Sequence, residues 1–235
     1  MIMSTIEQNL QAVRGSIAQA ADEAQRPAQD VTLLAVSKTF GADAVLQAAQ
    51  AGQTAFGENY LQEALDKIAA VQAALPQGSL CWHFIGPIQS NKTRPIAEHF
   101  DWVHTVEREK IAVRLSEQRP DGLSDLNICL QVNISGEASK SGVTPAELPA
   151  LARAVSRLPK LRLRGLMAIP EPETELARQR AAFARLRVLY QQLRDEGLAL
   201  DTLSMGMSAD LSAAVLEGAT IVRVGSAIFG SRNYS

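Results

Sequence analysis

The stretch LALDTLSMGMSADLSAAVLEGATIVRVGS, residues 198–226, contains the pattern that decides the fold. An apolar run at 198–203 is followed by a turn rich in glycine and serine, and then by a helical segment at 208–218. Ser208 is suited to the N-cap of that helix, and the glycine at its end is a common C-terminal signal. A second apolar run, rich in branched residues, follows at 220–224. The stretch therefore predicts two buried parallel strands joined by a helix.

The same alternation of strand and helix recurs along the rest of the chain. We expect eight buried strands, at residues 31–37, 54–59, 82–85, 101–106, 126–133, 161–167, 198–203 and 220–224. Helical segments follow them at 42–52, 61–75, from about 90, at 107–118, after 145, at 173–197, at 208–218 and after 226. Eight such units favour an α/β fold of the TIM-type (β/α)8 barrel class. An open, doubly wound parallel sheet is the structural alternative.

The N-terminal segment predicts one more helix. Apolar residues recur there at helical spacing, at Ile2, Ile6, Leu10, Val13 and Ile17. This spacing is typical of an amphipathic helix that packs on the domain, and the polar residues between leave no apolar core for a signal peptide. Because no linker or shift in composition marks a boundary, we expect a single domain over residues 1–235.

The composition excludes several classes of function. The chain is 46% hydrophobic and 20% charged, with a formal net charge of −2. This near-balance argues against nucleic acid or an anionic membrane as the main partner, since both bind through excess basic charge. Cys81, Cys129 and the three histidines lack metal-ligand spacing, so we expect no metal site. No apolar run approaches the ~18 residues of a membrane span, and we expect a cytoplasmic protein.

Lys38 is the most informative single residue. It directly follows a buried strand, and the catalytic or binding residues of such barrels lie at the carboxyl ends of the strands. One interpretation is a lysine that extends its ammonium group into solvent. The other is a Schiff-base lysine, because burial lowers the pKa of an amine and makes it nucleophilic toward an aldehyde.

The turns after the last two predicted strands favour a phosphate site. Ser208 precedes one helix, and Gly225 and Ser226 precede the final segment. Glycine lets backbone N–H groups approach an anion closely, and a helix N-terminus adds partial positive charge. The alternative is that these residues are ordinary caps and turns. Both turns lie where barrels of this class frequently bind phosphate.

Arg223 lies inside the last predicted strand, between apolar neighbours. A charge buried in this way needs an internal partner. We expect either a carboxylate such as Glu58, in a structural ion pair, or an acceptor atom of a bound ligand.

Several motifs together resemble one known family. They are LLAVSKTF at 33–40, FGENYLQEALDK at 56–67, WHFIGPIQSNK at 82–92, VNISGEASKSG at 132–142 and LSMGMSADLSAAVLEGATIVRVGSAIFG at 203–230. In this order they are similar to the pyridoxal phosphate homeostasis proteins, whose barrel resembles the N-terminal domain of alanine racemase. The resemblance covers nearly the whole chain. It implies a fold-type III barrel that binds pyridoxal 5′-phosphate (PLP) as a covalent aldimine on Lys38.

The resemblance also implies roles for individual residues. Ser208, Gly225 and Ser226 would hold the phosphate, helped by the backbone at Met207, and Arg223 would face the pyridine nitrogen. The residues expected to line or pack against the ring are Asn59, His83 and Met205. Lys140 is either a secondary contact for PLP or a solvated loop charge.

Binding is favoured over catalysis. A PLP racemase needs a base on each face of the substrate, and none of Tyr60, Tyr190 and Tyr234 is a convincing second base. We therefore expect a PLP carrier that acts in PLP homeostasis without robust turnover, as a monomer, with apo PLP-dependent enzymes as recipients. An amino-acid racemase-like enzyme is the alternative, and a barrel that binds a phosphorylated metabolite without an aldehyde is a third hypothesis.

Overall fold

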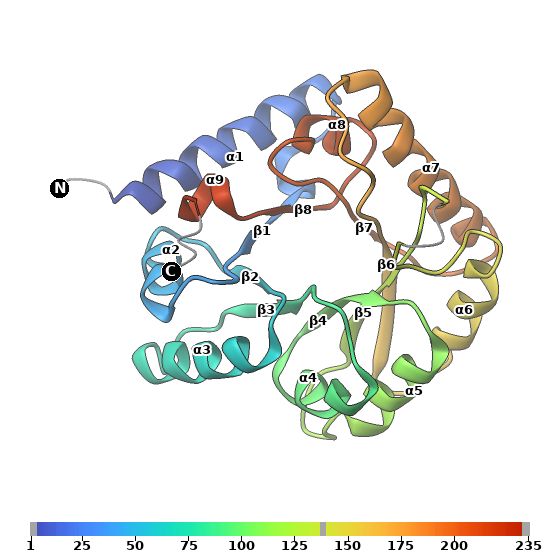
Figure 1. Ribbon diagram of the computed structural model, residues 1–235, viewed down its shortest axis with the longest axis horizontal. Coiled ribbons are helices and arrows are strands. Elements are labelled where there is room, and N and C mark those ends of the chain that lie inside the picture. Colours follow the sequence, from blue (N-terminus) through green and yellow to red (C-terminus); the bar gives the residue numbers. More distant parts are fainter. Residues whose placement is uncertain (1–3, 137–139, 232–235) are drawn as a thin grey trace.

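The computed structural model describes residues 4–136 and 140–231. Within these residues, eight parallel strands form a closed barrel in which each strand pairs with the next along the chain (Figure 1). The strands are β1 (Thr32–Val36), β2 (Ala55–Glu58), β3 (Cys81–Phe84), β4 (Trp102–Val106), β5 (Leu126–Gln131), β6 (Leu161–Met167), β7 (Thr202–Ser204) and β8 (Ile221–Val224). The last strand pairs with the first, with Val224 opposite Ala35. This pairing confirms the barrel and excludes the open sheet.

Helices surround the barrel on its outer side (Figure 1). The α-helices are α1 (Thr5–Glu23), α2 (Ala42–Gln50), α3 (Leu61–Ala74), α4 (Thr93–His99), α5 (Glu109–Gln118), α6 (Leu148–Val155), α7 (Leu176–Asp195), α8 (Leu211–Leu216) and α9 (Ser226–Phe229). Two short 3-10 helices, η1 (Ala28–Asp30) and η2 (Ser90–Lys92), complete the described elements. In the described part of the chain, no helix is both long and apolar enough to cross a membrane.

The helix expected near the N-terminus is α1, and it packs on the barrel domain against α2, α8 and α9. Leu10, Val13 and Ile17 are buried on its inner face, as their spacing predicted. The Asn9 side-chain amide donates to the carbonyl of Ile228 at 2.9 Å, which ties the first helix to the last. Ile2 lies outside the described residues.

The inside of the barrel is separate from the main core between strands and helices. A small apolar cluster in the interior is formed by Leu34, Ala55 and Ile221, with Ile85 and Trp102 beside it. The larger cluster joins the outward faces of the strands to the helices. Because side chains alternate along a strand, every second residue points inward, and several of these inward residues are polar.

Two predicted boundaries in the opening stretch are wrong. Residues 198–201 do not extend β7, because Gly197 at a φ of +98° and Leu198, whose N–H donates to Leu193, form the C-terminal turn of α7. Ser208 is not the N-cap of α8, which is Asp210. The Asp210 carboxylate instead accepts a 2.7 Å hydrogen bond from the Met207 N–H and shapes the turn before the helix.

Candidate ligand site at the carboxyl ends of the strands

Lys38 lies directly beyond the end of β1. The Ser37 N–H still donates to the Gly57 carbonyl at 3.0 Å, so the strand pairing continues up to the residue before the lysine. Ser37 is fully buried and Lys38 is half-buried. The next turn is closed by the Phe40 N–H, which donates back to the Ser37 carbonyl at 3.1 Å. Lys38 is thus fixed at the mouth of the barrel by a strand on one side and a tight turn on the other.

The turn after β8 adjoins the same strand. A Cβ added to Gly225 would lie 3.2 Å from the carbonyl oxygen of Val36, so this glycine packs closely against the end of β1. Gly225 is the N-cap of α9, and the exposed Ser226 is its first helical residue. The structure therefore brings two of the predicted phosphate residues beside the end of β1, the strand that leads into Lys38.

The turn after β7 approaches the start of α9 from the other side. Met205 is fully buried, and Gly206 adopts a φ of +98° that turns the chain outward. Met207 and Ser208 are exposed. A cavity of about 200 Å³ is lined by Ser208 together with Val224 and Ala227, which flank Gly225 and Ser226. Ser208 and the two neighbours of the Gly225–Ser226 turn therefore border one cavity, whose wall also includes residues of α1 and α7.

Arg223 is buried in β8, and its partner is not the expected carboxylate. Its guanidinium donates to the Ser204 hydroxyl at 2.7 Å and to the Ala168 carbonyl at 3.0 Å. Glu58 pairs instead with Lys67, at 2.6 Å, so the expectation of an Arg223–Glu58 ion pair is wrong. Burial lowers the pKa of Arg223 to about 10, which still leaves the group charged at neutral pH.

A chain of buried hydrogen bonds continues from Ser204 across the barrel. The Ser204 hydroxyl lies 2.7 Å from Nδ1 of His104, and Nε2 of His104 lies 2.8 Å from Nδ1 of His83. Nε2 of His83 lies 3.3 Å from Sγ of Cys81. Burial lowers the pKa of His83 to about 3 and holds that of His104 well below its usual value, so both rings are neutral at pH 7.

His83 is therefore a residue of the barrel interior. It is 2% exposed, and its ring stacks on Trp102 with centroids 5.2 Å apart. Its lining of a ligand ring stays a prediction. Sequence reasoning missed His104 and Ser204 as parts of the site. Their positions inside predicted strands were a signal, but only the strand register shows that they meet Arg223.

Asn59 follows β2 on the side of the mouth formed by β3 to β5. It lines a cavity of about 220 Å³ together with Thr105 and Gln131. Its side-chain oxygen is buried and, among the described residues, has no hydrogen-bond partner. A buried polar atom of this kind calls for an explanation, and a donor group of a ligand supplies one. Gly86 packs on the Asn59 backbone, since a Cβ there would lie 2.1 Å from its carbonyl oxygen.

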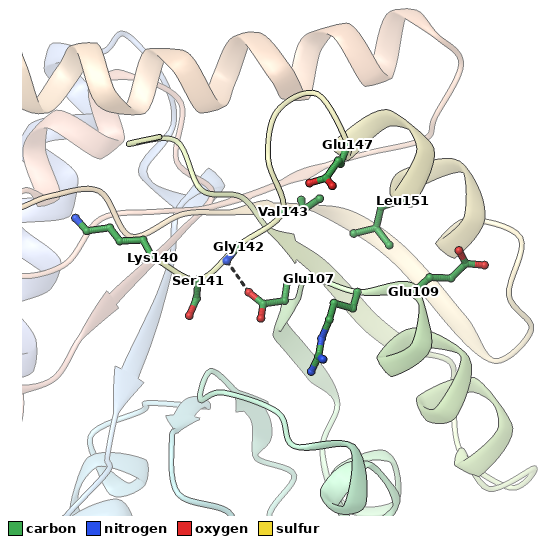
Figure 2. Close-up of a pocket in the computed structure, with 9 residues that line it drawn as sticks. Glu107, Glu109, Lys140, Ser141, Gly142, Val143, Glu147 and Leu151 are labelled. Carbon is green, nitrogen blue, oxygen red and sulfur yellow. Dashed lines mark hydrogen bonds between the residues drawn. The ribbon is translucent and has the colours of Figure 1, made fainter. Parts of the chain in front are cut away.

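Lys140 lies on the flank of the mouth. Its amine pairs with Glu171 at 3.1 Å. It borders a cavity of about 490 Å³ in which Glu107 accepts a hydrogen bond from the Gly142 N–H. Figure 2 shows the Lys140 side chain extending away from Glu107. The part of the predicted loop at 137–139 lies outside the described residues.

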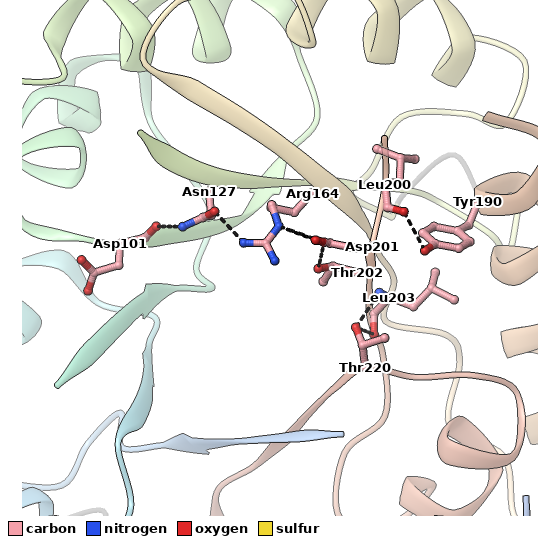
Figure 3. A network of polar contacts seen from close by, with 9 residues as sticks. All are labelled: Asp101, Asn127, Arg164, Tyr190, Leu200, Asp201, Thr202, Leu203 and Thr220. Atoms are coloured by element: carbon pink, nitrogen blue, oxygen red, sulfur yellow. Dashed lines mark hydrogen bonds and ion pairs between the residues drawn. The ribbon is translucent and has the colours of Figure 1, made fainter. Parts of the chain in front are cut away.

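The opposite end of the barrel is closed by a different set of polar contacts (Figure 3). Arg164 pairs with Asp201 at 2.8 Å, donates to Asn127 at 2.8 Å and stacks over Trp102 at 4.6 Å. Its cationic group is thus already engaged within the protein. The predicted site residues lie at the other end. In the described part of the chain, no three His, Cys, Asp or Glu side chains group in a way that could hold a metal ion.

Comparison with known proteins finds similar sequences over nearly the whole chain. Residues 8–233 match the family model described as alanine racemase, N-terminal domain. The pyridoxal phosphate homeostasis protein of Pseudomonas aeruginosa is 66% identical, over 99% of this chain and 98% of its own length. The protein of the same name from Escherichia coli strain K12 is 53% identical, over 99% of each chain.

Solved structures show the same fold. PipY of Synechococcus elongatus PCC7942, solved with PLP bound, is 39% identical with a TM-score of 0.82, covering 96% of this chain and all of its own. Alanine racemase from Corynebacterium glutamicum is 17% identical with a TM-score of 0.71, covering 97% of this chain and 60% of its own. The second likeness concerns the fold alone.

Proposed function

The chain belongs to the pyridoxal phosphate homeostasis protein family, and on this premise we propose that it binds PLP and serves as a carrier or buffer in intracellular PLP homeostasis. The observation that carries the proposal is that Lys38 and the Gly225–Ser226 turn leave the paired strands β1 and β8 at the same end of the barrel. An amine and a turn that we assign to an anion thereby leave neighbouring strands, which supports the assignment to the aldehyde and the phosphate of PLP.

The described residues fit this ligand. PLP supplies an aldehyde that condenses with a lysine amine and releases water, and Lys38 is the amine that we assign to this bond. The N–H groups at the start of α9 and the hydroxyls of Ser208 and Ser226 provide donors for the phosphate oxygens. The unpartnered oxygen of Asn59 is a further acceptor at the mouth.

Arg223 is the group that we assign to the pyridine nitrogen. Guanidinium is only a donor and stays charged, so it keeps a facing nitrogen unprotonated. A PLP ring whose pyridine nitrogen is unprotonated withdraws electrons only weakly from the bonds at the α-carbon of an amino acid. This favours holding PLP over turning over amino acids, and we propose that the protein lacks robust catalytic turnover.

The tyrosines of the described chain are placed in keeping with this view. Tyr60 is the N-cap of α3 and 52% exposed, and the hydroxyl of Tyr190 donates to the Leu200 carbonyl at 3.1 Å on the outer layer. Neither contributes a buried base to the mouth of the barrel. Tyr234 lies outside the described residues. We further propose that the protein acts as a monomer and that apo PLP-dependent enzymes receive its PLP.

The visible absorbance of the purified protein mixed with PLP tests the proposal. We expect a protein-bound band in the wild type and in Lys110→Ala, whose lysine is exposed on α5, and its loss in Lys38→Ala. PLP should also raise the melting temperature of the wild type, because it binds the folded state. Protein that carries no absorbance band after free PLP is removed, with an unchanged melting temperature, contradicts the proposal and favours a phosphorylated ligand without an aldehyde. Rapid exchange of solvent deuterium into the α-carbon of an amino acid contradicts the absence of turnover.

A further inference from the structure

Two side chains of α3, Glu63 and Lys67, form hydrogen bonds with the backbone on both sides of Lys38. We refer to these two side chains as the clamp. The Lys67 amine donates to the Ser37 carbonyl at 2.8 Å, and a Glu63 carboxylate oxygen accepts from the Thr39 N–H at 2.7 Å. The same two side chains pair with each other at 2.9 Å across one helical turn. The Ser37 carbonyl and the Thr39 N–H belong to the two peptide groups that flank Lys38. Both peptide groups are therefore held from outside the barrel.

The turn that these contacts hold is strained. Thr39 has a φ of +68°, a region that branched side chains rarely adopt. A residue held there is less stable than in the common backbone regions and persists only where its surroundings fix it. The hydrogen bond from its N–H to Glu63 supplies part of that constraint, so the lysine is held on a turn that α3 helps to keep in place.

The one buried cation of the clamp, Lys67, has two carboxylate partners. Glu58, fully buried, accepts from the Lys67 amine at 2.6 Å and from the Ser37 hydroxyl at 2.5 Å. Lys67 is itself only 4% exposed, so its ammonium group has lost most of its water and is compensated by the two carboxylates. An ammonium group fixed in this way is a rigid donor toward the Ser37 carbonyl.

We propose that Glu63 and Lys67 are positioning residues for Lys38, presenting its amine to the aldehyde in one orientation. The inference rests on the proposed function. In the step concerned, the neutral amine nitrogen attacks the aldehyde carbon and a C=N bond forms. The aldehyde oxygen leaves as water with the two amine protons. Neither residue is assigned a contact with PLP. The clamp therefore affects the rate at which the C=N bond forms and leaves the affinity of non-covalent binding unchanged.

Variants of Glu63 separate an effect on the covalent rate from an effect on non-covalent affinity. This side chain is partly exposed, so its loss leaves the core intact. The covalent step is followed as the growth of the protein-bound absorbance after mixing with PLP. Non-covalent binding is measured with pyridoxine 5′-phosphate, which lacks the aldehyde. In Glu63→Ala we expect the covalent rate to fall about tenfold or more, as lost orientation predicts. Its affinity for pyridoxine 5′-phosphate should stay within about twofold of the wild type, because the phosphate and ring contacts are unchanged.

Two further variants act as controls. Glu63→Gln keeps an oxygen that can accept a hydrogen bond from the Thr39 N–H, so this variant should keep most of the wild-type covalent rate. Asp66→Ala removes a carboxylate from the same helix that pairs only with Gln62 among the contacts described, and it should behave as the wild type. A rate in Glu63→Ala equal to that of Asp66→Ala overturns the inference. A wild type that forms no adduct overturns the proposed function itself, so the two failures are distinguishable.

A double variant tests the clamp from its other half, and also covers the case in which Glu63→Ala does not fold. Lys67→Met combined with Glu58→Gln removes the buried ion pair as a unit and keeps an acceptor for the Ser37 hydroxyl. It loses the hydrogen bond to the Ser37 carbonyl. We expect the same slow covalent step with unchanged affinity for pyridoxine 5′-phosphate, and a wild-type rate contradicts the inference.

Discussion

Arg223 donates a 2.7 Å hydrogen bond to the hydroxyl of Ser204. This contact determines which group donates in each of the buried hydrogen bonds that follow, from Ser204 to His104 and His83. Guanidinium has no acceptor, so the single hydroxyl hydrogen of Ser204 is free to be donated to Nδ1 of His104. His104 then carries its proton on Nε2 and donates to Nδ1 of His83. Burial keeps both rings neutral, and the contact with Arg223 assigns which nitrogen of each ring carries the hydrogen.

Removal of the Ser204 hydroxyl should be costly. In Ser204→Ala, Arg223 and His104 each lose a partner in a site that water does not reach, and we expect a loss of about 1–3 kcal/mol in the free energy of unfolding. Ser208→Ala, which shortens an exposed serine, should change it by less than about 0.5 kcal/mol. Urea denaturation of both variants checks the difference, and equal stabilities contradict the hydrogen-bonded chain.

The neutral rings predict a dependence of stability on pH. The pKa of His83 falls to about 3 in the folded protein and that of His104 is also depressed, whereas both titrate near 6.5 when unfolded. The unfolded state therefore binds more protons below pH 6.5, and stability is lost as the pH falls. For His83 this loss amounts to about 2 kcal/mol between pH 7 and pH 5, and His104 adds a loss in the same direction.

Urea unfolding at these two pH values measures that loss. His99→Gln alters an exposed histidine of α4 and should keep the wild-type dependence of stability on pH. His83→Gln should lose the part of that dependence that the His83 ring contributes. A wild-type free energy of unfolding that is the same at both pH values contradicts the burial of neutral rings.

Two glycines offer a matched pair of substitutions. Gly86→Ala places a Cβ 2.1 Å from the Asn59 carbonyl oxygen, so the backbone must move, and we expect a loss of about 1–3 kcal/mol. Gly15 in α1 has no atom within 4 Å of an added Cβ, and Gly15→Ala should stabilise by about 0.5–1 kcal/mol. Thermal unfolding of both variants checks the opposite signs. A neutral Gly86→Ala contradicts the close approach of the two turns.

Ser226 should discriminate ligands by their phosphate. Ser226→Glu places a carboxylate where the phosphate is assigned, and we expect about tenfold or greater loss of affinity for PLP, equivalent to about 1.4 kcal/mol. The affinity for pyridoxal, which has no phosphate, should change little. Ser226→Thr keeps the hydroxyl and serves as the control. Equal losses for PLP and pyridoxal would place the phosphate elsewhere.

Local patterns in the sequence were enough to predict the barrel. Apolar runs of strand length alternate with amphipathic segments, and such units close when the last strand reaches the first, as Val224 does opposite Ala35. The location of Lys38 at the mouth follows from its place after a buried run. The end of α7 was misjudged because an apolar residue such as Leu198 suits both a strand and the turn that ends a helix. Hydrophobic periodicity alone does not distinguish these two positions.

Contacts between distant residues were beyond such patterns. His104 and Ser204 are 100 residues apart and meet only because the strand register places them at one level of the barrel. A carboxylate was one of two partners considered for Arg223, because a buried cation often has one, but within the protein it donates to a hydroxyl and a carbonyl. Glu63 and Lys67 have the spacing of an ordinary helix-surface ion pair, and nothing local shows that they face the peptide groups around Lys38.

The most direct test of the account is borohydride reduction of the protein mixed with PLP, followed by mass mapping of the modified peptide. We expect one major modified lysine, Lys38, with a mass increase that matches reduced phosphopyridoxyl, and no comparable modification of Lys140 or Lys67. The label should persist at low PLP concentration, where surface lysines do not react. Modification spread over exposed lysines, with Lys38 unmodified, would contradict the account.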